Sequence, residues 1–347
     1  MTSPPPNSEL LLVNGSTGDP VLFIDFPGRN NALLFDAGEN AALGLERLGD
    51  LEAVFITHHH VDHFIGFDRI VRANLDRDKT LRVFGPIGTI RKVYNRITSY
   101  EYPFFPFQQL VLKVHEILPG RLRSALLEYA RRFPEPEVRE TSASNPVIYE
   151  TDDLSIEAEP VDHTVPCLAF ALVEKPGIQP DPDRLAAGPL RPGPWVGQVL
   201  GLLRSGAPAE TLVTIEGRPF PLGRLAERYF AVSSGSRSAY VTDTAWSEAA
   251  RPGLLRLAHR ARRLYCDSFY AQAQHEQAEK YRHMTATQAA EFARLAEVEE
   301  LVLIHFATRY QGQYETLVEE ARRIFPRTSA EIPPARLNKE RSGANGF

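Results

Sequence analysis

The sequence predicts an α/β protein in which layers of strands and helices pack on one another and a polar site lies where strands end. Three observations lead to this prediction. Short apolar strands alternate with helical segments along the chain, and several strands end directly in a histidine or an aspartate. The third is composition: 347 residues with 43% apolar and 24% charged side chains are typical of a globular protein.

The strands are indicated by short runs of apolar and β-branched residues between glycine, proline and asparagine turns. We expect strands over residues 9–13, 21–26, 32–35, 51–56, 81–84, 154–159, 168–174, 238–242 and 301–304. Helical spacing of leucine and alanine predicts helices over residues 121–132, 195–203 and 285–296, the first of them ended by prolines. Gly66 is expected to let the backbone turn sharply into a further helix.

The chain is expected to hold one hydrolase domain, residues 9–332, with an inserted arm. Residues 176–221 are dense in proline and glycine and interrupt the strand pattern, which predicts the arm. Residues 1–8 and 333–347 are polar and rich in Pro, Gly and Ser, and we expect both ends to be disordered.

Charge and cysteine content exclude several classes of protein. The formal net charge of −5 provides no global basic field, so an RNA contact needs a local patch. Cys167 and Cys266 are too few for a disulfide framework or a cysteine-type zinc site. No apolar run approaches the roughly 18 residues of a membrane span, and the N-terminal segment lacks the features of a secretion signal. We therefore expect a cytoplasmic protein without membrane contact.

A dense group of histidines follows the apolar run 51–56. His58 and His60 alternate and would face the same way in an extended segment, whereas His59 would point away. Asp62 and His63 follow after a turn. Imidazole and carboxylate are zinc ligands, and burying this set without a metal would leave many polar groups unsatisfied. The segment therefore predicts a metal site.

Residues 57–63 match the T-H-x-H-x-D-H signature, and the chain thereby resembles the metallo-β-lactamase superfamily. The rest of the superfamily pattern follows in order, with strand-end matches at Asp36, His163, Asp243 and His305. The resemblance implies a four-layer αββα metallo-β-lactamase fold that carries the inserted arm.

The resemblance also implies two metal ions, two Zn²⁺ in the first instance, although the ligand types leave Mn²⁺ or Fe²⁺ open. One ion would be held by His58, His60, His163 and Asp243. The other would be held by Asp62, His63, Asp243 and His305. Asp36 would not be a ligand itself but would support the ligands in their positions.

Within the superfamily the chain resembles ribonuclease Z, the endonuclease that trims the 3′ end of precursor tRNA. Four segments carry the resemblance: 84–88, 192–194 with 202–206, 283–286, and 307–310. It implies removal of the 3′ trailer by a metal-bridged hydroxide, precursor tRNA as the substrate, and a homodimer.

The same resemblance implies roles for individual residues. Asp62, His283 and Asp267 would be catalytic, with His283 near the scissile phosphate and Asp267 fixing its ring. Thr285 and Arg309 would position phosphate or support the site. The arm would grip RNA through Pro192, Gly193, Pro194 and Arg204.

The chain departs from the family in places that leave other functions open. Asp267 stands where the family has the glutamate of an H-E-A-T segment, Thr242 replaces a glycine, and residues 121–145 look inserted. One alternative is a hydrolase of a small molecule: a cyclic nucleotide, another phosphoester, a sulfate ester or a lactone. Another is an RNA-binding or scaffold protein with an inactive site.

Overall fold

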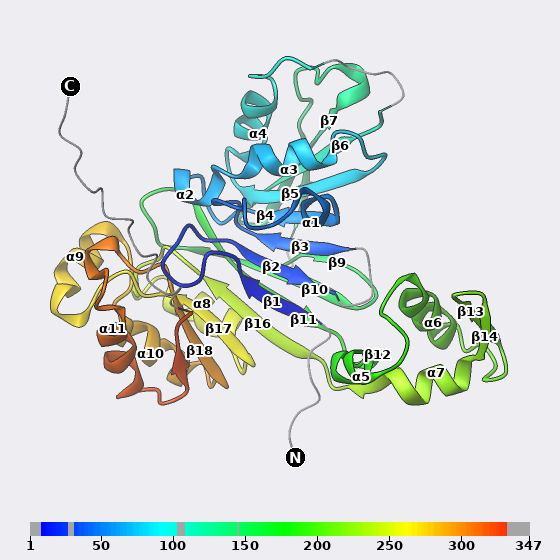
Figure 1. The fold of residues 1–347 in the computed structure, drawn as a ribbon. Helices are drawn as coiled ribbons and strands as arrows, with labels where there is room; N and C mark the ends of the chain where they lie inside the picture. Colours follow the sequence, from blue (N-terminus) through cyan, green and yellow to red (C-terminus); the bar gives the residue numbers. More distant parts are fainter. Residues whose placement is uncertain (1–7, 27–30, 103–107, 144–145, 332–347) are drawn as a thin grey trace, which may run out of the picture.

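The computed structural model describes residues 8–26, 31–102, 108–143 and 146–331. Its body is a sandwich of two large sheets with helices on both outer faces, which gives the four layers that the sequence predicted (Figure 1). The segments predicted to be disordered, residues 1–8 and 333–347, lie outside the described residues, except for Ser8, which is buried.

The first sheet has eight strands that neighbour one another in chain order. They are β1 (Glu9–Leu12), β2 (Leu22–Asp25), β3 (Ala32–Phe35), β4 (Leu51–Phe55), β5 (Thr80–Pro86), β6 (Val111–Leu118), β7 (Arg121–Glu128) and β8 (Arg139–Ser142). Strands β3 to β6 run parallel to one another, and the pairs at either side are antiparallel.

The second sheet has seven strands in the order β19-β18-β17-β16-β11-β10-β9. Their bounds are β9 (Val147–Glu150), β10 (Leu154–Val161), β11 (Cys167–Glu174), β16 (Ser236–Val241), β17 (Arg263–Asp267), β18 (Glu300–Ile304) and β19 (Thr328–Ser329). Strands β16 to β19 are parallel, whereas β9, β10, β11 and β16 pair antiparallel.

Helices cover the outer face of each sheet. The first sheet is covered by α1 (Leu45–Gly49), α3 (Phe67–Asn74) and α4 (Thr89–Ile97). The second is covered by α8 (Arg251–Ala258), α10 (Ala286–Leu295) and α11 (Tyr314–Arg322). Short helices α2 (Val61–Phe64) and α9 (His275–Tyr281), with the 3₁₀ turns η1 (Tyr129–Arg131), η2 (Gln272–Gln274) and η3 (Thr308–Tyr310), occupy connections. No helix among the described residues is long and apolar enough to span a bilayer.

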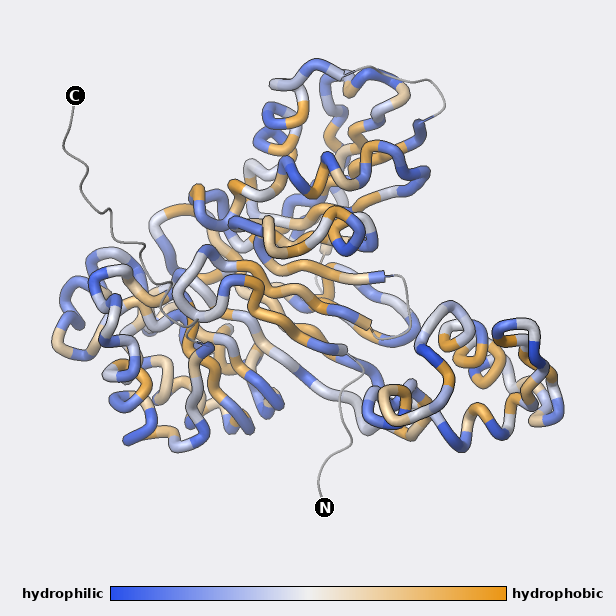
Figure 2. Tube along the Cα trace, viewed as in Figure 1, coloured by the Kyte–Doolittle hydropathy of each residue, from blue (hydrophilic) through white to orange (hydrophobic). Residues whose placement is uncertain are grey.

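The strands carry apolar residues on both faces, because each sheet is covered on one face by the other sheet and on the opposite face by helices. In β3, Leu33 and Phe35 point into the core between the sheets, and Ala32 and Leu34 point toward the helices. Aromatic rings fill the inner core, where Phe35 packs on Phe55 and Phe170. Figure 2 shows the apolar residues gathered in the strands of the sandwich.

This topology brings the carboxyl ends of parallel strands from both sheets to one edge. Strands β3 and β4 end there in the first sheet, and β16, β17 and β18 end there in the second. Ligand sites in α/β sheets form at such strand ends. The edge therefore collects the polar residues that follow these strands.

The arm is a small subdomain that leaves the opposite end of β11 and returns into β16 (Figure 1). It consists of β12 (Gly177–Pro180), α5 (Pro182–Ala187), α6 (Pro194–Arg204), β13 (Leu212–Ile215), β14 (Arg218–Pro221), α7 (Leu222–Tyr229) and β15 (Phe230–Ser233). It has its own apolar core around Trp195, Val199 and Tyr229, and β12 pairs with β15 at its base. The inserted unit thus extends beyond residue 221 to the end of β15.

The prediction of a helix over residues 121–132 is wrong. Residues 121–128 form strand β7, which pairs with β6 along its whole length after a turn at Gly120, whose φ is +71°, and only the 3₁₀ turn η1 follows. Ala125 and Leu127 are buried while Leu126 between them is 51% exposed, which is the alternation of a strand. The region that looked inserted extends the first sheet through β7 and β8 rather than adding a helix.

The other predicted strands and the helices α6 and α10 are confirmed, with bounds shifted by one or a few residues. The elements that were not predicted are strands β6, β8, β9, β12 to β15, β17 and β19 and helices α1, α2, α4, α5, α7, α8, α9 and α11. The structure gives a reason for a glycine at position 66 other than the predicted sharp turn. Gly66 has an ordinary φ of −81°, but a Cβ there would lie 2.1 Å from the carbonyl oxygen of Gly38. The position requires close backbone approach and not an unusual turn.

Candidate metal centre and catalytic dyad

Three polar residues that follow strands adopt left-handed backbone conformations. Asp36 after β3, Asp243 after β16 and His305 after β18 have φ of 57°, 44° and 61°. Non-glycine residues rarely adopt this region, and holding one there costs about 1–3 kcal/mol. The conformation turns the chain abruptly at the end of each strand, so that the side chain faces the shared edge.

The first group of candidate ligands is His58, His60, His163 and Asp243, whose donor atoms all lie within 4.8 Å of one another. Oδ2 of Asp243 lies 3.6 Å from Nε2 of His58 and 3.8 Å from Nε2 of His163. Nε2 of His163 is 3.4 Å from Nδ1 of His60. The structure therefore brings together the four residues expected for one ion.

The second group is Asp62, His63 and His305, which meet the same distance criterion. Oδ2 of Asp62 lies 3.2 Å from Nε2 of His305 and 3.6 Å from Nε2 of His63. The other oxygen of Asp243, Oδ1, lies 3.3 Å from Nε2 of His63 and 3.3 Å from Nδ1 of His305. Asp243 thus faces one group with each of its two oxygens.

The donor atoms fit divalent metal ions. Nε2 of His58, Nε2 of His63 and Nδ1 of His305 are buried and have no hydrogen-bond partner within the described residues. Burial, reinforced by His63, lowers the pKa of His58 to about 2, so its imidazole is neutral, as a metal ligand must be. A set of buried nitrogens without partners beside carboxylates is what a metal site provides.

The carboxylates also favour a bound cation. Burial lowers the pKa of His63, but Asp243 and Asp36 outweigh it and hold that pKa well above its ordinary value. Burial raises the pKa of Asp62, yet the hydrogen bond from His305 and the neighbouring His63 bring it below its ordinary value. The edge therefore attracts positive charge, whether a proton or a metal ion.

A buried carboxylate behind the ligands orients them. Asp36 accepts hydrogen bonds from Nδ1 of His63 at 2.8 Å, from the backbone N–H of Thr57 at 2.7 Å and from the Tyr240 hydroxyl at 3.1 Å. In addition, the hydroxyl of Thr57 lies 3.1 Å from Nδ1 of His58. Such partners fix the ring orientation of metal-binding histidines.

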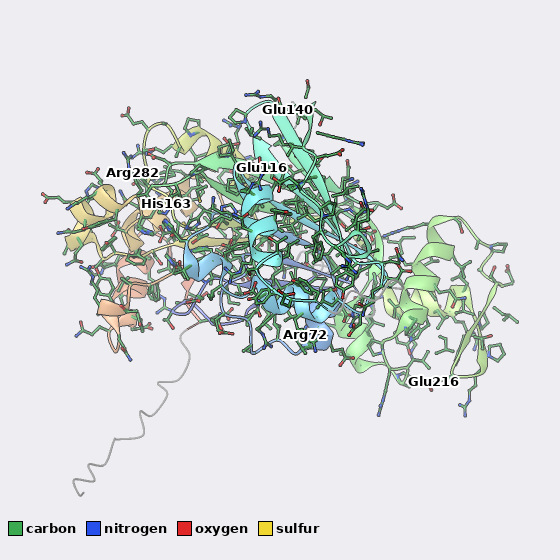
Figure 3. The ribbon with its side chains drawn as sticks, turned by 90° about the horizontal axis from the view of Figure 1, so that it is seen from above. Arg72, Glu116, Glu140, His163, Glu216 and Arg282 are labelled. Atoms are coloured by element: carbon green, nitrogen blue, oxygen red, sulfur yellow. The ribbon has the colours of Figure 1, made fainter. Side chains whose placement is uncertain are left out.

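His163 is held from a different part of the chain. Its Nδ1 lies 3.1 Å from the carbonyl oxygen of Arg282, whose guanidinium forms an ion pair with Asp162 at 3.0 Å. Arg282 ends α9 in the left-handed conformation, with φ of 59°. Figure 3 shows Arg282 and His163 close together, whereas Glu216 lies far away on the arm.

His283 and Asp267 form a hydrogen-bonded dyad next to the candidate ligands. Oδ2 of Asp267 lies 2.9 Å from Nδ1 of His283 and also accepts the N–H of Met284 at 3.1 Å. Nε2 of His283 lies 4.0 Å from Oδ2 of Asp243. Burial lowers the pKa of His283, but Asp267 outweighs it and raises the pKa above its ordinary value.

The remaining predicted residues have clear structural positions. Thr285 caps α10 by accepting the N–H of Gln288 at 3.1 Å. Arg309 is exposed, with its guanidinium 5.3 Å from the ring centre of Tyr270. His59 turns away from the ligands, with Nε2 3.1 Å from the Thr89 hydroxyl, and burial together with Lys92 lowers its pKa to about 3.

In the arm, Pro192, Gly193 and Pro194 lead into α6, which begins at Pro194. Arg204 at the end of that helix forms an ion pair with Asp153, in the turn between β9 and β10. The structure thus gives Arg204 a carboxylate partner on the body of the protein. Its predicted contact with RNA stays a prediction.

Sequence reasoning missed four residues that support the site. The side chains of Thr57 and Tyr240 hydrogen-bond to Asp36, the backbone of Arg282 contacts His163, and the ring of Phe269 stacks on His283. Thr57 lies inside the recognised signature and could have been found there. Tyr240 and Arg282 act across long separations in the chain, and Phe269 contacts His283 across the intervening helix α9, which local spacing does not reveal.

Similarity to known proteins identifies the class to which this protein belongs. Residues 20–74 match the family described as the Metallo-beta-lactamase superfamily. The crystal structure of the short form of human tRNase Z has a TM-score of 0.51 to this chain, at 18% identity, covering 89% of this chain and 92% of the human one. That likeness shows the shared fold. Fold and site together define a metal-dependent hydrolase of the metallo-β-lactamase class.

Two curated proteins named Ribonuclease Z resemble almost the whole chain. The one from Deinococcus radiodurans is 31% identical over 299 residues, which cover 85% of this chain and 88% of that protein. The one from Treponema denticola is 26% identical over 311 residues, covering 85% of this chain and 84% of that protein. The chain belongs to the ribonuclease Z family.

Asp36→Ala removes the acceptor that holds His63, Thr57 and Tyr240, so we expect affinity for zinc to fall about 10–100-fold. A chelator competition titration measures this affinity. Asp36→Asn is the matched control, because asparagine also tolerates the left-handed conformation and keeps an acceptor oxygen for Thr57. It should lose less. Wild-type affinity in a folded Asp36→Ala protein would show that Asp36 does not support the ligands.

Proposed function

We propose that this protein removes the 3′ trailer from precursor tRNA by endonucleolytic hydrolysis. The observation that carries the proposal is the His283–Asp267 dyad 4.0 Å from an aspartate that faces two groups of metal ligands. Membership of the ribonuclease Z family supports the choice of substrate. Water would break the bond between phosphorus and the 3′ oxygen, leaving a 3′-hydroxyl on the tRNA and a 5′-phosphate on the trailer.

In this proposal the ions are held by the predicted ligands, with Asp243 shared between them. Two divalent ions, when bound, supply a water of lowered pKa and offset the negative charge that develops on the phosphoryl oxygens. Asp62 is the most open of the ligand carboxylates, with its side chain 35% exposed. It is thereby placed to orient the attacking water and accept its proton.

His283 would act on the leaving side of the reaction. Asp267 accepts a hydrogen bond from Nδ1–H of His283, and Nε2 is the atom that faces Asp243 and the ligands. A raised pKa keeps a proton on Nε2 over more of the neutral range. That proton can stabilise the phosphate or pass to the departing 3′ oxygen. Asp267 would hold His283 with a side chain that is one methylene shorter than that of the glutamate in the family.

Zinc is the metal we propose, because three imidazoles and a carboxylate in one group suit it well, although manganese and iron share these ligand types. We further propose a cytoplasmic homodimer, on the strength of the family resemblance. The arm leaves the body at the strand ends opposite the metal centre. RNA touching both therefore has to span the sandwich within one chain, whereas a dimer can bring an arm toward the partner's site.

Hydrolysis of a small phosphoester is the second candidate. The arm carries six arginines against five carboxylates over residues 177–233, and Arg204 is paired with Asp153. Phosphate binding depends mainly on positive charge. A nearly neutral arm therefore favours a substrate smaller than tRNA.

The first test incubates zinc-loaded protein with a precursor tRNA that has a 3′ trailer, and maps the product ends. We expect one cut just after the discriminator base. His58→Ala and His283→Ala form a matched pair: both should lose cleavage, but only His58→Ala should lose metal, as measured by elemental analysis. His283→Ala should cost about 100-fold or more in kcat, because a positioned proton donor contributes 10²–10⁴-fold.

Failure of the wild-type protein to cut the tRNA, while it hydrolyses bis(p-nitrophenyl) phosphate, would favour the small-ester candidate. Normal turnover by metal-loaded His283→Ala would remove that residue from the mechanism.

The arm's proposed role is tested by replacing residues 177–233 with a short Gly-Ser linker. Gly177 and Ser233 are paired at the base of the arm and the arm has its own core, so the body should remain folded. We expect unchanged hydrolysis of bis(p-nitrophenyl) phosphate and a KM for precursor tRNA raised about tenfold or more through lost phosphate contacts. Equal losses on both substrates, in protein with a normal thermal unfolding curve, would contradict a separate gripping role.

A further inference from the structure

Phe269 lies against the dyad in a position to which the proposed chemistry gives no role. Its ring is stacked on His283, with the ring centres 4.3 Å apart and an interplanar angle of 18°. The same ring is 5.0 Å from His305 at an angle of 42°. Phe269 thus touches both the dyad histidine and a candidate metal ligand, and is itself only partly buried.

The backbone of Phe269 is fixed by the strand ends on either side. Its N–H donates to Oδ1 of Asp267 at 3.0 Å, and its carbonyl accepts the N–H of Ala307 at 3.3 Å. The preceding Ser268 donates both its N–H and its hydroxyl to the carbonyl of Ile304. The ring therefore projects from a rigid segment, and its position is set by β17 and β18.

The hydrogen bond between Asp267 and His283 does not fix the imidazole alone. The imidazole can still pivot about its Cβ–Cγ bond within the tolerance of its one hydrogen bond at Nδ1, and a pivot carries Nε2 away from its place 4.0 Å from Asp243. Asp267 is also shared, because the same oxygen accepts the N–H of Met284. A flat ring stacked on one face of the imidazole opposes this pivot. On another side the ring of His163 approaches at 5.3 Å and 68°.

We propose that Phe269 is a positioning residue for His283, which holds the imidazole plane so that Nε2 faces the metal centre. Stacked aromatic pairs at this separation are mutually attractive. The inference rests on the proposed function in one respect only: His283 has to act in the reaction for its orientation to affect turnover.

Two substitutions distinguish the effect of the flat aromatic ring from the effect of apolar volume alone. Phe269→Leu keeps the apolar volume and loses the flat face, whereas Phe269→Tyr keeps the face. We expect Phe269→Leu to lower kcat about 10–100-fold, because a misplacement of about 1 Å can cost up to about 100-fold. KM and zinc content should stay unchanged, and Phe269→Tyr should recover most of the loss.

A double-mutant cycle tests whether the effect passes through His283. In a His283→Ala background, Phe269→Leu should cause no further loss, because the residue it positions is gone. An equal fractional loss in both backgrounds would overturn the proposal. A change mainly in KM would instead place Phe269 in contact with substrate, and lost zinc would make it a support for His305. Either result also overturns it.

An NMR measurement decides the point without reference to activity. In zinc-loaded protein labelled at histidine Cε1, the His283 signal is assigned by its absence in His283→Ala. Stacking on Phe269 should move the His283 Cε1–H resonance upfield, Phe269→Tyr should keep this shift, and Phe269→Leu should abolish it. A His283 resonance that is the same in wild type and Phe269→Leu would contradict the proposal. If the protein does not cut tRNA, the proposed function fails while this measurement still tests Phe269.

Discussion

The arrangement of the site depends on one carboxylate that two groups of histidines share. Oδ2 of Asp243 faces His58 and His163, and Oδ1 faces His63 and His305. Asp243 is 2% exposed, so its charge is offset almost entirely by what lies around it. Because its two oxygens point to different groups, Asp243 would hold both ions if each group binds one. The remaining candidate ligands, Asp62 and His60, lie beside these histidines, Asp62 against His63 and His305 and His60 against His163.

The donor atoms of the candidate ligands come together because parallel strands of both sheets end at the same edge. The left-handed conformations of Asp36, Asp243 and His305 turn the side chains inward at some cost in backbone strain. Asp36 then fixes His63, and the Arg282 carbonyl lies against His163. The same edge carries Asp267 and His283, so the dyad lies beside the candidate ligands. Precise ligand geometry thus comes from strand ends and from the buried partners behind them.

The sequence singled out the candidate ligands because they follow recognisable apolar strands and a long, specific signature, and the structure brings these residues together. It failed at residues 121–132, where leucine and alanine spacing suits a helix as well as a strand. Pairing with β6 and the turn at Gly120 decide for the strand, and both are set by the folded sheet. The hydrogen bond from Tyr240 to Asp36 joins residues 204 positions apart, and the contact between Phe269 and His283 joins two separate connections. Such contacts have no periodic signal in the chain.

The central claim, that Asp243 is shared by two ions, is tested most directly by a crystal structure of the zinc-loaded protein with anomalous scattering measured at the zinc edge. The account predicts two zinc peaks per chain, one on each side of the Asp243 carboxylate, with His58, His60 and His163 around one and Asp62, His63 and His305 around the other. A single peak, or two peaks of which one lies away from Asp243, would contradict it.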